Sequence, residues 1–456
     1  MNSTNSRHAG VKLARITLGI LAVFATLFVI YASLVPLRYT PRSWGETIAS
    51  FKAIAWLNLS IGNRADWVAN GLIMLPSGFL AAGAVDWRRK SRVPLLFASP
   101  LIVASLVAVV FSIEFVQIWF PPRVVSQNDI FAGVIGAFAG VALWWLMGRQ
   151  LATQIEAFLM ASPGVTRWGI AMQFAMLGLL LYNLMPLDLI WSPAEWSSKA
   201  AKGGFQIMDL SLTKKSVFLF CIAAFRVVPF TLLAVLLRNR QHAVRTGLLW
   251  ACALEIVKVP VFSRAVSVTD VAASALGVLF AAQVAKIFWR FLQRLDRVWF
   301  WFLAAASWSG VMLAGFLLRF ERVVRDTDVL KSRFEGILSV PFARAHSSSE
   351  FQAGENILLK IAVFGMLSFC LAGWASRADA SGFYRRLIVV LSVVWIALMS
   401  ISIEVGQVFL EPLVPDATDW IIYAVGAIVG VMAYRMLMPS RRLLSLELDR
   451  RLEESL

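Results

Sequence analysis

The stretch FSIEFVQIWFPPRVVSQNDIFAGVIGAFAG, residues 111–140, decides the fold of this chain. It predicts the end of one apolar helix, a short turn with two prolines, and the start of a second helix. Glu114 and Asp129 flank the turn and stand fifteen residues apart, and Gly136 follows the aspartate by seven residues. The stretch therefore describes a helical hairpin with a carboxylate on either side of its turn.

The same arrangement of Glu, Asp and Gly returns twice further along the chain. The later copies hold, with the same spacing, Glu255, Asp270 and Gly277, and then Glu404, Asp419 and Gly426. Acidic residues are only 27 of the 456, so chance does not account for two further copies of the set. The sequence predicts an internal triplication.

The composition identifies the class of protein. The chain is 59% hydrophobic and 15% charged, with a mean hydropathy of +0.73, which is too apolar for a soluble domain. The net charge of +16 comes mostly from Lys and Arg in short loops beside apolar segments, where positive charge sets topology, so we expect no nucleic-acid partner. The three cysteines and three histidines form no disulfide framework and no zinc motif, so we expect no metal and no cofactor.

The hydropathy pattern predicts an all-α, polytopic integral membrane protein with about twelve transmembrane helices in three parallel four-helix repeats. The first repeat covers residues 1–150, a divergent second repeat covers 151–295, and the third covers 296–456 and ends in a basic cytoplasmic tail. Four helices is an even number, so the three repeats share one orientation.

The loop charges predict that orientation. One set of short loops is rich in arginine, with Arg89, Arg240 and Arg377 among its members. The opposite set holds Arg123 alone, then Arg264 alone, and in the third repeat no basic residue. By the positive-inside rule both termini are cytoplasmic and the Glu/Asp turns are extracytoplasmic. We expect a multi-pass protein of the inner (cytoplasmic) membrane.

The turn residues of the first repeat form a candidate ligand site. An ionisable side chain within a span is costly and usually faces protein or a water-filled cavity, which singles out Glu114, with Gln117 on the same helix face. Asp129 begins the next helix, where it is either a ligand-binding group or an N-cap. Arg123 on the turn either holds a carboxylate or phosphate of a ligand or pairs with a nearby acid.

The second repeat differs because it carries its own cations. Lys258 stands where the first repeat has its glutamine, and Arg226 lies in the preceding span. The set Glu255, Lys258 and Arg226 therefore predicts a structural ion pair and a degenerate site. In the third repeat Lys360 is a further buried base, with Glu404 as the expected partner.

The glycines that follow the aspartates by seven and eleven residues indicate close helix packing. They are Gly136 and Gly140 in the first repeat and Gly426 and Gly430 in the third. Small residues at this spacing allow two helix backbones to approach each other.

The segments NGLIMLPSGF (residues 70–79) and SIEFVQ (112–117), with Asp129 and its glycines, resemble the VanZ-like family, membrane proteins named for a teicoplanin-resistance accessory protein. The resemblance covers one four-helix unit, well in the first and third repeats and weakly in the second. It implies an envelope-associated membrane protein and candidate ligand-binding positions: Asn70, Glu114, Gln117 and Asp129, and in the third repeat Asn356, Glu404, Gln407 and Asp419. The asparagine that family members often carry four residues after the Asp is replaced by Gly133, Ser274 and Tyr423.

Three functions stay open at the level of sequence. The first is a cell-envelope protein that binds or moves an envelope lipid or glycan precursor at the extracytoplasmic side, with membrane lipids as partners. The second is an outer-leaflet enzyme with Glu114 and Asp129 as an acid/base pair, and the third is a non-catalytic membrane assembly factor. The sequence offers no nucleophile with a base, no metal set and no phosphate-binding loop, so we rank binding or transport first.

Overall fold

A computed structural model describes most of the chain. The described residues are 2–35, 37–56, 61–87, 89–121, 125–161, 164–206, 214–237, 239–292, 297–318, 322–337, 341, 350–378 and 382–438. They form two compact units: the first is Met1–Ala157, Pro186–Leu189 and Phe342–Phe351, and the second is Phe158–Met185, Ile190–Pro341 and Gln352–Leu456. The first unit holds the first repeat, and the second holds the other two. The boundaries predicted between the repeats, at 150 and 295, stay predictions.

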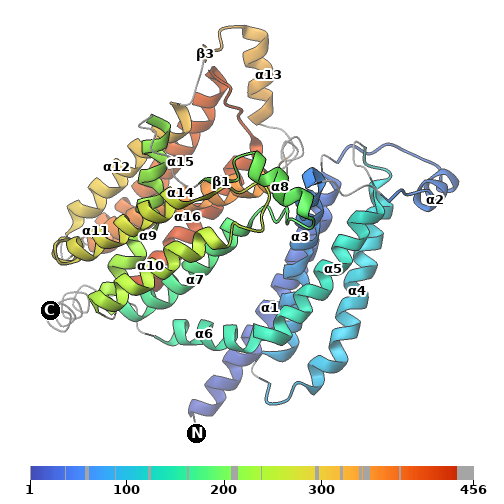
Figure 1. Cartoon of the computed structure of the whole chain (residues 1–456), viewed down its shortest axis with the longest axis horizontal. Helices are drawn as coiled ribbons and strands as arrows, with labels where there is room; N and C mark the ends of the chain where they lie inside the picture. Colours follow the sequence, from blue (N-terminus) through green and yellow to red (C-terminus); the bar gives the residue numbers. More distant parts are fainter. Residues whose placement is uncertain are drawn as a thin grey trace. The chain divides into compact units, whose positions relative to one another are not determined.

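The first unit is a bundle of four long apolar helices that run alongside one another (Figure 1). They are α1 (Asn2–Leu34), α3 (Ile61–Asp86), α4 (Val93–Gln117) and α5 (Gln127–Leu143). A short helix, α2 (Trp44–Lys52), lies between α1 and α3 in the sequence. A π-helical turn, η1 (Trp144–Gly148), and α6 (Arg149–Met160) follow α5.

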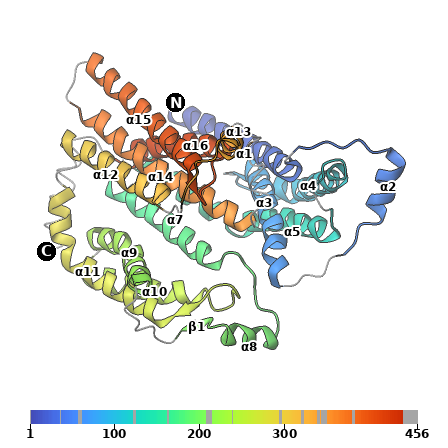
Figure 2. The same ribbon diagram turned by 90° about the horizontal axis from the view of Figure 1, so that it is seen from above.

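The second unit repeats this order of helices twice. The middle repeat consists of α7 (Val165–Leu184), α8 (Pro193–Ala201), α9 (Lys214–Leu237), α10 (Arg240–Ile256) and α11 (Val268–Leu292). The third repeat consists of α12 (Val298–Leu317), α13 (Thr327–Ile337), α14 (Glu350–Arg377), α15 (Gly382–Phe409) and α16 (Ala417–Leu437). Figures 1 and 2 both show α9, α10 and α11 side by side.

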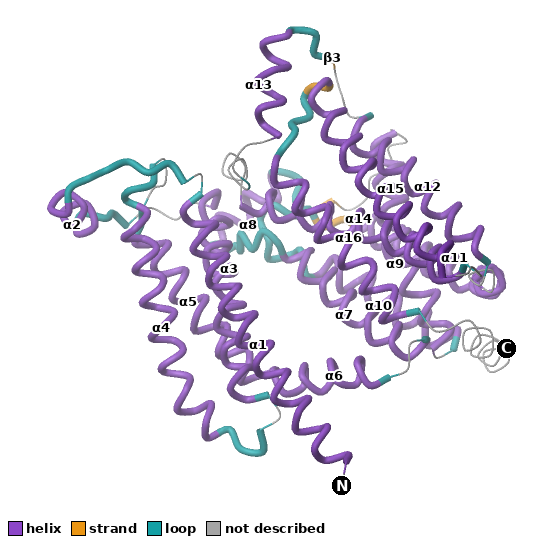
Figure 3. The backbone as a smooth tube through the Cα atoms, turned by 180° about the vertical axis from the view of Figure 1, so that it is seen from behind, coloured by secondary structure: helices purple, strands orange, loops and turns teal. Residues whose placement is uncertain are grey.

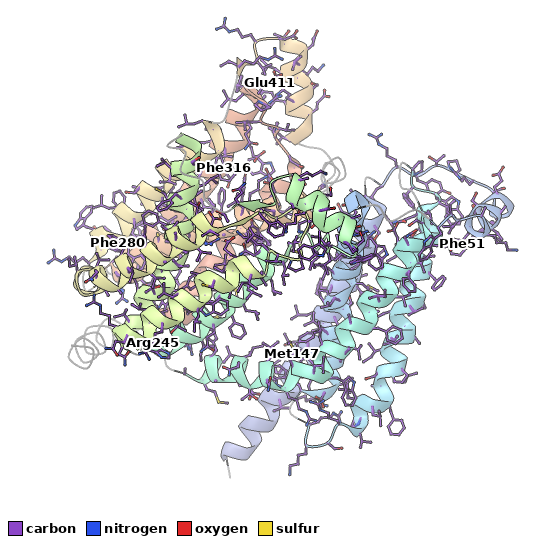
Figure 4. The ribbon with its side chains drawn as sticks, in the orientation of Figure 1. Phe51, Met147, Arg245, Phe280, Phe316 and Glu411 are labelled. Carbon is purple, nitrogen blue, oxygen red and sulfur yellow. The ribbon has the colours of Figure 1, made fainter. Side chains whose placement is uncertain are left out.

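Two pairs of very short strands join parts of the second unit. β1 (Phe205–Gln206) pairs in parallel with β2 (Val266–Ser267), and β3 (Arg322–Val323) pairs antiparallel with β4 (Leu410–Glu411). Figure 3 shows β3 beside the start of α13, and Figure 4 places Glu411 of β4 there as well. Glu411 accepts a hydrogen bond from Arg322 Nε at 2.5 Å. Each strand pair therefore ties the segment that contains β1 or β3 to the turn that follows a Glu-bearing helix.

Among the described residues, nine helices are long and apolar enough to cross a membrane. They are α1, α3, α4, the helix continuing from α5 to α6, α11, α12, α14, α15 and α16. This confirms an all-α multi-pass membrane protein. The other three expected spans are present as helices α7, α9 and α10, all in the middle repeat. In α9 the described apolar segment runs from Leu219 to Val235.

One helix pair in each repeat packs backbone to backbone at glycines. A Cβ added at Gly136 of α5 would overlap the carbonyl oxygen of Gly71 in α3. The same holds for Gly277 of α11 against Ala224 of α9, and for Gly430 of α16 against Gly365 of α14. The predicted role of the glycines in close helix packing is confirmed, and the α3–α5 type of pair holds each repeat together.

The long segment after the first helix of each repeat contains a short helix that the sequence analysis did not predict. These helices are α2, α8 and α13. α2 begins with a capping box, in which Ser43 and Glu46 each accept from the other's backbone N–H. The Ser43 backbone donor also lowers the pKa of Glu46 below its ordinary value. The pattern Ser-x-x-Glu, repeated at Ser192 and Glu195, was the available sequence signal.

One cation on each of α8 and α13 attaches that helix to the chain at the end of a Glu-bearing helix. Lys199 of α8 is only 1% exposed, and its Nζ donates to three carbonyl oxygens in the turn after α10, those of Lys258, Val259 and Val261, at 3.0, 2.9 and 2.7 Å. Arg333 of α13 donates to the carbonyls of Gln407, Val408, Leu410 and Leu413 at the end of α15. Arg333 thus contacts carbonyl groups of the last turn of α15, which a helix end leaves without intrahelical partners, and Lys199 contacts carbonyl groups of the turn after α10.

Candidate functional site

The site is built where the Glu-bearing helix ends and the Asp-bearing helix begins. Ser126 is the N-cap of α5, and its hydroxyl accepts from the backbone N–H of Asp129 at 3.1 Å. Ser267 plays the same part for Asp270, and Asp416 caps α16 three residues before Asp419. The N-cap interpretation of the aspartates is therefore wrong, because the cap lies one turn earlier. Each Asp carboxylate is left to contact side chains of other helices.

In the first repeat the carboxylate of Asp129 joins α3 to α5. Asn70 Nδ2 donates to Asp129 Oδ1 at 2.6 Å, and the Ser126 hydroxyl donates to Oδ2 at 2.6 Å. Asp129 is half-buried, whereas its counterpart in the third repeat, Asp419, is only 2% exposed. Among the described residues, its side-chain partners are neutral.

Glu114 and Gln117 lie on the last turn of α4 in the same repeat. Both side chains are buried, with Glu114 6% exposed. Gln117 Nε2 donates to the carbonyl of Ser33 at 2.9 Å, which ties α4 to the end of α1. Arg123, the basic residue expected on this turn, lies outside the described residues.

The third repeat encloses its carboxylates more completely. Lys360 Nζ donates to both oxygens of Asp419 at 2.5 and 2.6 Å. The Tyr423 hydroxyl donates to Glu404 Oε1 at 2.8 Å and lies 3.5 Å from Asp419 Oδ2. The second oxygen of Glu404 accepts from the backbone N–H of Asp416 at 3.1 Å. Glu404 is fully buried and Asp419 is 2% exposed, so this cluster is sealed by its own side chains.

Two expectations for the third repeat need correction. Lys360, not Asn356, takes the place of Asn70: it stands 59 residues before its aspartate, as Asn70 does, whereas the Asn356 side chain is exposed. Lys360 also pairs with Asp419 and not with Glu404. The residue matched by type therefore lies one helical turn from the residue matched by position. Gln407 is buried, as Gln117 is, and its carbonyl accepts from Arg333.

In the middle repeat the structure brings Glu255, Lys258 and Arg226 together. Glu255 Oε1 accepts from Lys258 Nζ at 2.6 Å and from Arg226 Nη2 at 2.9 Å. Its other oxygen accepts from the backbone N–H of Ser267 at 3.2 Å. Lys258 also lies 3.6 Å from Asp270. The middle repeat thus neutralises its own carboxylates with two cations.

The position four residues after the aspartate also belongs to this site. Ser274 accepts from Arg226 at 3.1 Å, and Tyr423 bridges the two acids of the third repeat. In the first repeat the same position is Gly133, which packs against Val110 of α4 and brings no polar group. The sequence showed only that the family's asparagine was missing, because the direction of this helix face depends on how the helices pack.

The family comparison agrees with the repeats that hold these clusters. A family model described as VanZ/LLP1 matches residues 15–148 and 300–438, more than half of the chain. The chain belongs to the VanZ/LLP1 family. The two matches correspond to the first and third repeats, so this VanZ-like protein carries the family unit in tandem, and the middle repeat stays a prediction from the sequence. No curated protein and no solved structure gave a match.

The chemistry of the three clusters is that of ion pairing and hydrogen bonding. No group of three or more His, Cys, Asp or Glu side chains suited to a metal occurs among the described residues. The second and third clusters balance their carboxylates with Lys and Arg, whereas Asp129 has neutral partners within the described chain. The first repeat therefore differs from the others in charge at an otherwise matching place.

Proposed function

We propose that this VanZ-like protein binds an envelope lipid or glycan precursor at the extracytoplasmic ends of α3, α4 and α5, and that Asp129 receives an amino group of that ligand. One observation carries the proposal: the ammonium of Lys360 contacts Asp419 in the third repeat, whereas the matching residue in the first repeat is the neutral Asn70. The first repeat thus keeps the carboxylate without that internal cation.

The energetics favour a ligand at Asp129. A carboxylate at membrane depth is costly unless a cation or several donors compensate it. Asn70 and Ser126 donate hydrogen bonds to Asp129 but carry no positive charge. A ligand ammonium at this carboxylate would form a charge-assisted hydrogen bond, which is stronger than a neutral one. Suitable ligands are an aminoethyl lipid headgroup or an amino group on a glycan-linked peptide.

The extracytoplasmic location is part of the proposal and follows from the loop charges. The acid/base enzyme, with Glu114 and Asp129 as its pair, has less support, because the sequence offers no nucleophile with a base, no metal set and no phosphate-binding loop. Binding also accounts for the difference between the repeats, since a sealed copy serves as structure while an open copy takes a ligand.

Two matched variants test the proposal. Asp129→Asn should keep the fold, because its partners are neutral, and should weaken binding of phosphatidylethanolamine at least tenfold, roughly 1.4 kcal/mol. Asp419→Asn should instead lower stability, because it leaves the Lys360 ammonium without its partner. Equilibrium binding to the purified protein in detergent, with phosphatidylglycerol as the second lipid, measures the first effect, and thermal unfolding measures the second.

Glu46→Gln is the charge control for this experiment. Glu46 is a fully exposed acid in α2, and glutamine is also accepted in a capping box. The control should bind the amine lipid as the parent does. Parent-like affinity in Asp129→Asn, with the unfolding temperature unchanged, would remove Asp129 from the site.

A further inference from the structure

The middle repeat contains a cavity of about 550 Å³ between α7, α9 and α10. Its wall is largely apolar and includes Met172, Met176, Phe230, Ala234, Trp250 and Leu254. We propose that this cavity holds one acyl chain of an anionic phospholipid, taken from the leaflet next to the α9–α10 turn. The positive-inside rule assigns that leaflet to the cytoplasm. The site lies in a different repeat from Asp129 and does not depend on the function proposed there.

The dimensions of the cavity suit a lipid chain. Its volume lies within the range of roughly 300–1,000 Å³ that is typical of small-molecule sites. Its lining follows α10 from His242 to Leu254. At a rise of 1.5 Å per residue, that distance is about 18 Å, close to the ~15 Å of one leaflet of hydrocarbon. A chain that lies along α10 therefore extends from the membrane surface towards its middle.

The mouth of the cavity is polar and basic. His242, Gln173 and Thr246 contribute to its lining, and His242 stands in the first turn of α10. Arg240 and Arg245 are exposed in the same two turns, and Figure 4 shows Arg245 at that end of the helices. Within the described residues, neither arginine forms an ion pair with the protein. Basic groups at a membrane surface attract anionic headgroups, so the phosphate of the lipid belongs at this end.

In the third repeat a tryptophan stands at the position that corresponds to Thr246 of the cavity wall. Trp395 of α15 stands nine residues before Glu404, as Thr246 of α10 stands nine before Glu255. Trp395 Nε1 donates to Ser309 of α12 at 3.0 Å and so closes α15 against α12. Thr246 is much smaller, and its hydroxyl donates to the His242 carbonyl of its own helix. The middle repeat thus has a void at the place where the third repeat has an indole.

The test fills the cavity with the side chain that the third repeat uses. Thr246→Trp should remove the bound lipid, and Leu249→Trp is the control, because Leu249 is on the same helix but is 71% exposed and does not line the cavity. The full-length protein is purified from vesicles of phosphatidylglycerol and phosphatidylethanolamine, and native mass spectrometry counts the phospholipids that remain. The parent and Leu249→Trp should retain one phosphatidylglycerol that Thr246→Trp lacks. Equal retention by a folded Thr246→Trp overturns the proposal.

Arg245→Gln tests the headgroup. This variant should retain a phospholipid but lose at least about fivefold in its preference for phosphatidylglycerol over phosphatidylethanolamine. An unchanged preference overturns the assignment of an anionic lipid.

A photoreactive amino acid at position 250 gives a result even where Thr246→Trp does not fold. After detergent exchange, a lipid adduct should persist at position 250 and disappear at position 249. Adducts at position 250 with protein alone overturn the proposal.

Discussion

Glu255 shows how a carboxylate is kept inside a weakly apolar repeat. Its two oxygens accept from Lys258, Arg226 and the backbone N–H of Ser267, so each oxygen has a donor. A buried ion pair adds little net stability, because two charges lose their water. Breaking the pair is a different matter, since the remaining charge stays buried without compensation. The contribution of Glu255 to stability is therefore expected to appear mainly when it is removed and its buried cations lose a carboxylate partner.

Glu255→Gln should lower the free energy of unfolding by roughly 3–5 kcal/mol, because it leaves Arg226 without its carboxylate and Lys258 with only Asp270, at 3.6 Å. Thermal unfolding of the purified variant measures the effect. Changing Arg226 and Lys258 to glutamine in the same background should recover part of the loss, because no net charge is then stranded. An unfolding temperature equal to that of the parent would show that the cluster does not stabilise the middle repeat.

The sequence identified the members of this cluster because opposite charges within apolar segments must find one another. It did not identify Lys360 as the partner of Asp419. That assignment requires the register between α14 and α16, which depends on how Gly426 and Gly430 pack, and not on residue type. Matching Asn356 to Asn70 by its amide placed the residue one turn away.

At the scale of elements, the repeats are held by pairs of helices in backbone contact. Gly136 and Gly140 of α5 fit against α3, and Gly426 and Gly430 of α16 fit against α14. Small residues at an interface let two helices approach closely within lipid. Close packing matters there because lipid tails are as apolar as the side chains, so burial of apolar surface does not by itself favour helix association. These pairs carry Asn70 with Asp129 and Lys360 with Asp419, so the glycines also fix the geometry of both sites.

Gly136→Leu and Gly430→Leu should each reduce the yield of folded protein in membranes several-fold, because the new side chain overlaps a backbone carbonyl on the facing helix. Gly310→Leu in α12 and Gly178→Leu in α7 are matched controls, since nothing lies near a Cβ added at either glycine. Detergent extraction followed by size-exclusion chromatography measures the folded fraction. Equal yields of the Gly136→Leu and Gly430→Leu variants and of the two controls would contradict the packing role.

The sequence pattern predicted the long helices and the helix contacts at glycines, but it missed the smaller elements. α2, α8 and α13 lie in segments that are polar and aromatic, so their hydrophobic pattern is weak, although Ser43 and Glu46 mark one start. The two-residue strands have no local signal at all. β2 and β4 form because the turns after α10 and α15 are held beside neighbouring segments by tertiary contacts.

At the scale of the whole molecule, two VanZ/LLP1 matches flank a stretch of sequence that is predicted to be a diverged middle repeat. The family match covers residues 15–148 and 300–438, and α7, α9 and α10 all lie between these regions. This middle repeat carries Lys258 where the first repeat has Gln117, it holds Arg226 and His242 within its helices, and it contains a cavity. This is consistent with a repeat that keeps the architecture while its site has changed.

The three repeats should share one orientation across the membrane. Single cysteines placed after Arg89, Arg240 and Arg377, in a chain whose own Cys221, Cys252 and Cys370 are replaced by serine, should react only with reagents that reach the cytoplasm. Cysteines near Arg123 and Pro415 should react from the outside, because those short loops hold few or no basic residues. Labelling of the Arg123 site from the cytoplasm alone would reverse the orientation and move the Asp129 site to the other leaflet.

The hydrogen bonds from Arg333 to the end of α15 couple the position of α13 to that of α15. Four carbonyl groups are held by a single guanidinium, so α13 cannot swing away without breaking charge-assisted hydrogen bonds or pulling the last turn of α15 with it. Glu404 lies only five residues from the end of the same helix. A displacement of α13 should therefore also displace the end of α15 and the Glu404 carboxylate. In the same way a displacement of α8, which Lys199 holds to the turn after α10, should displace the end of the helix that carries Glu255.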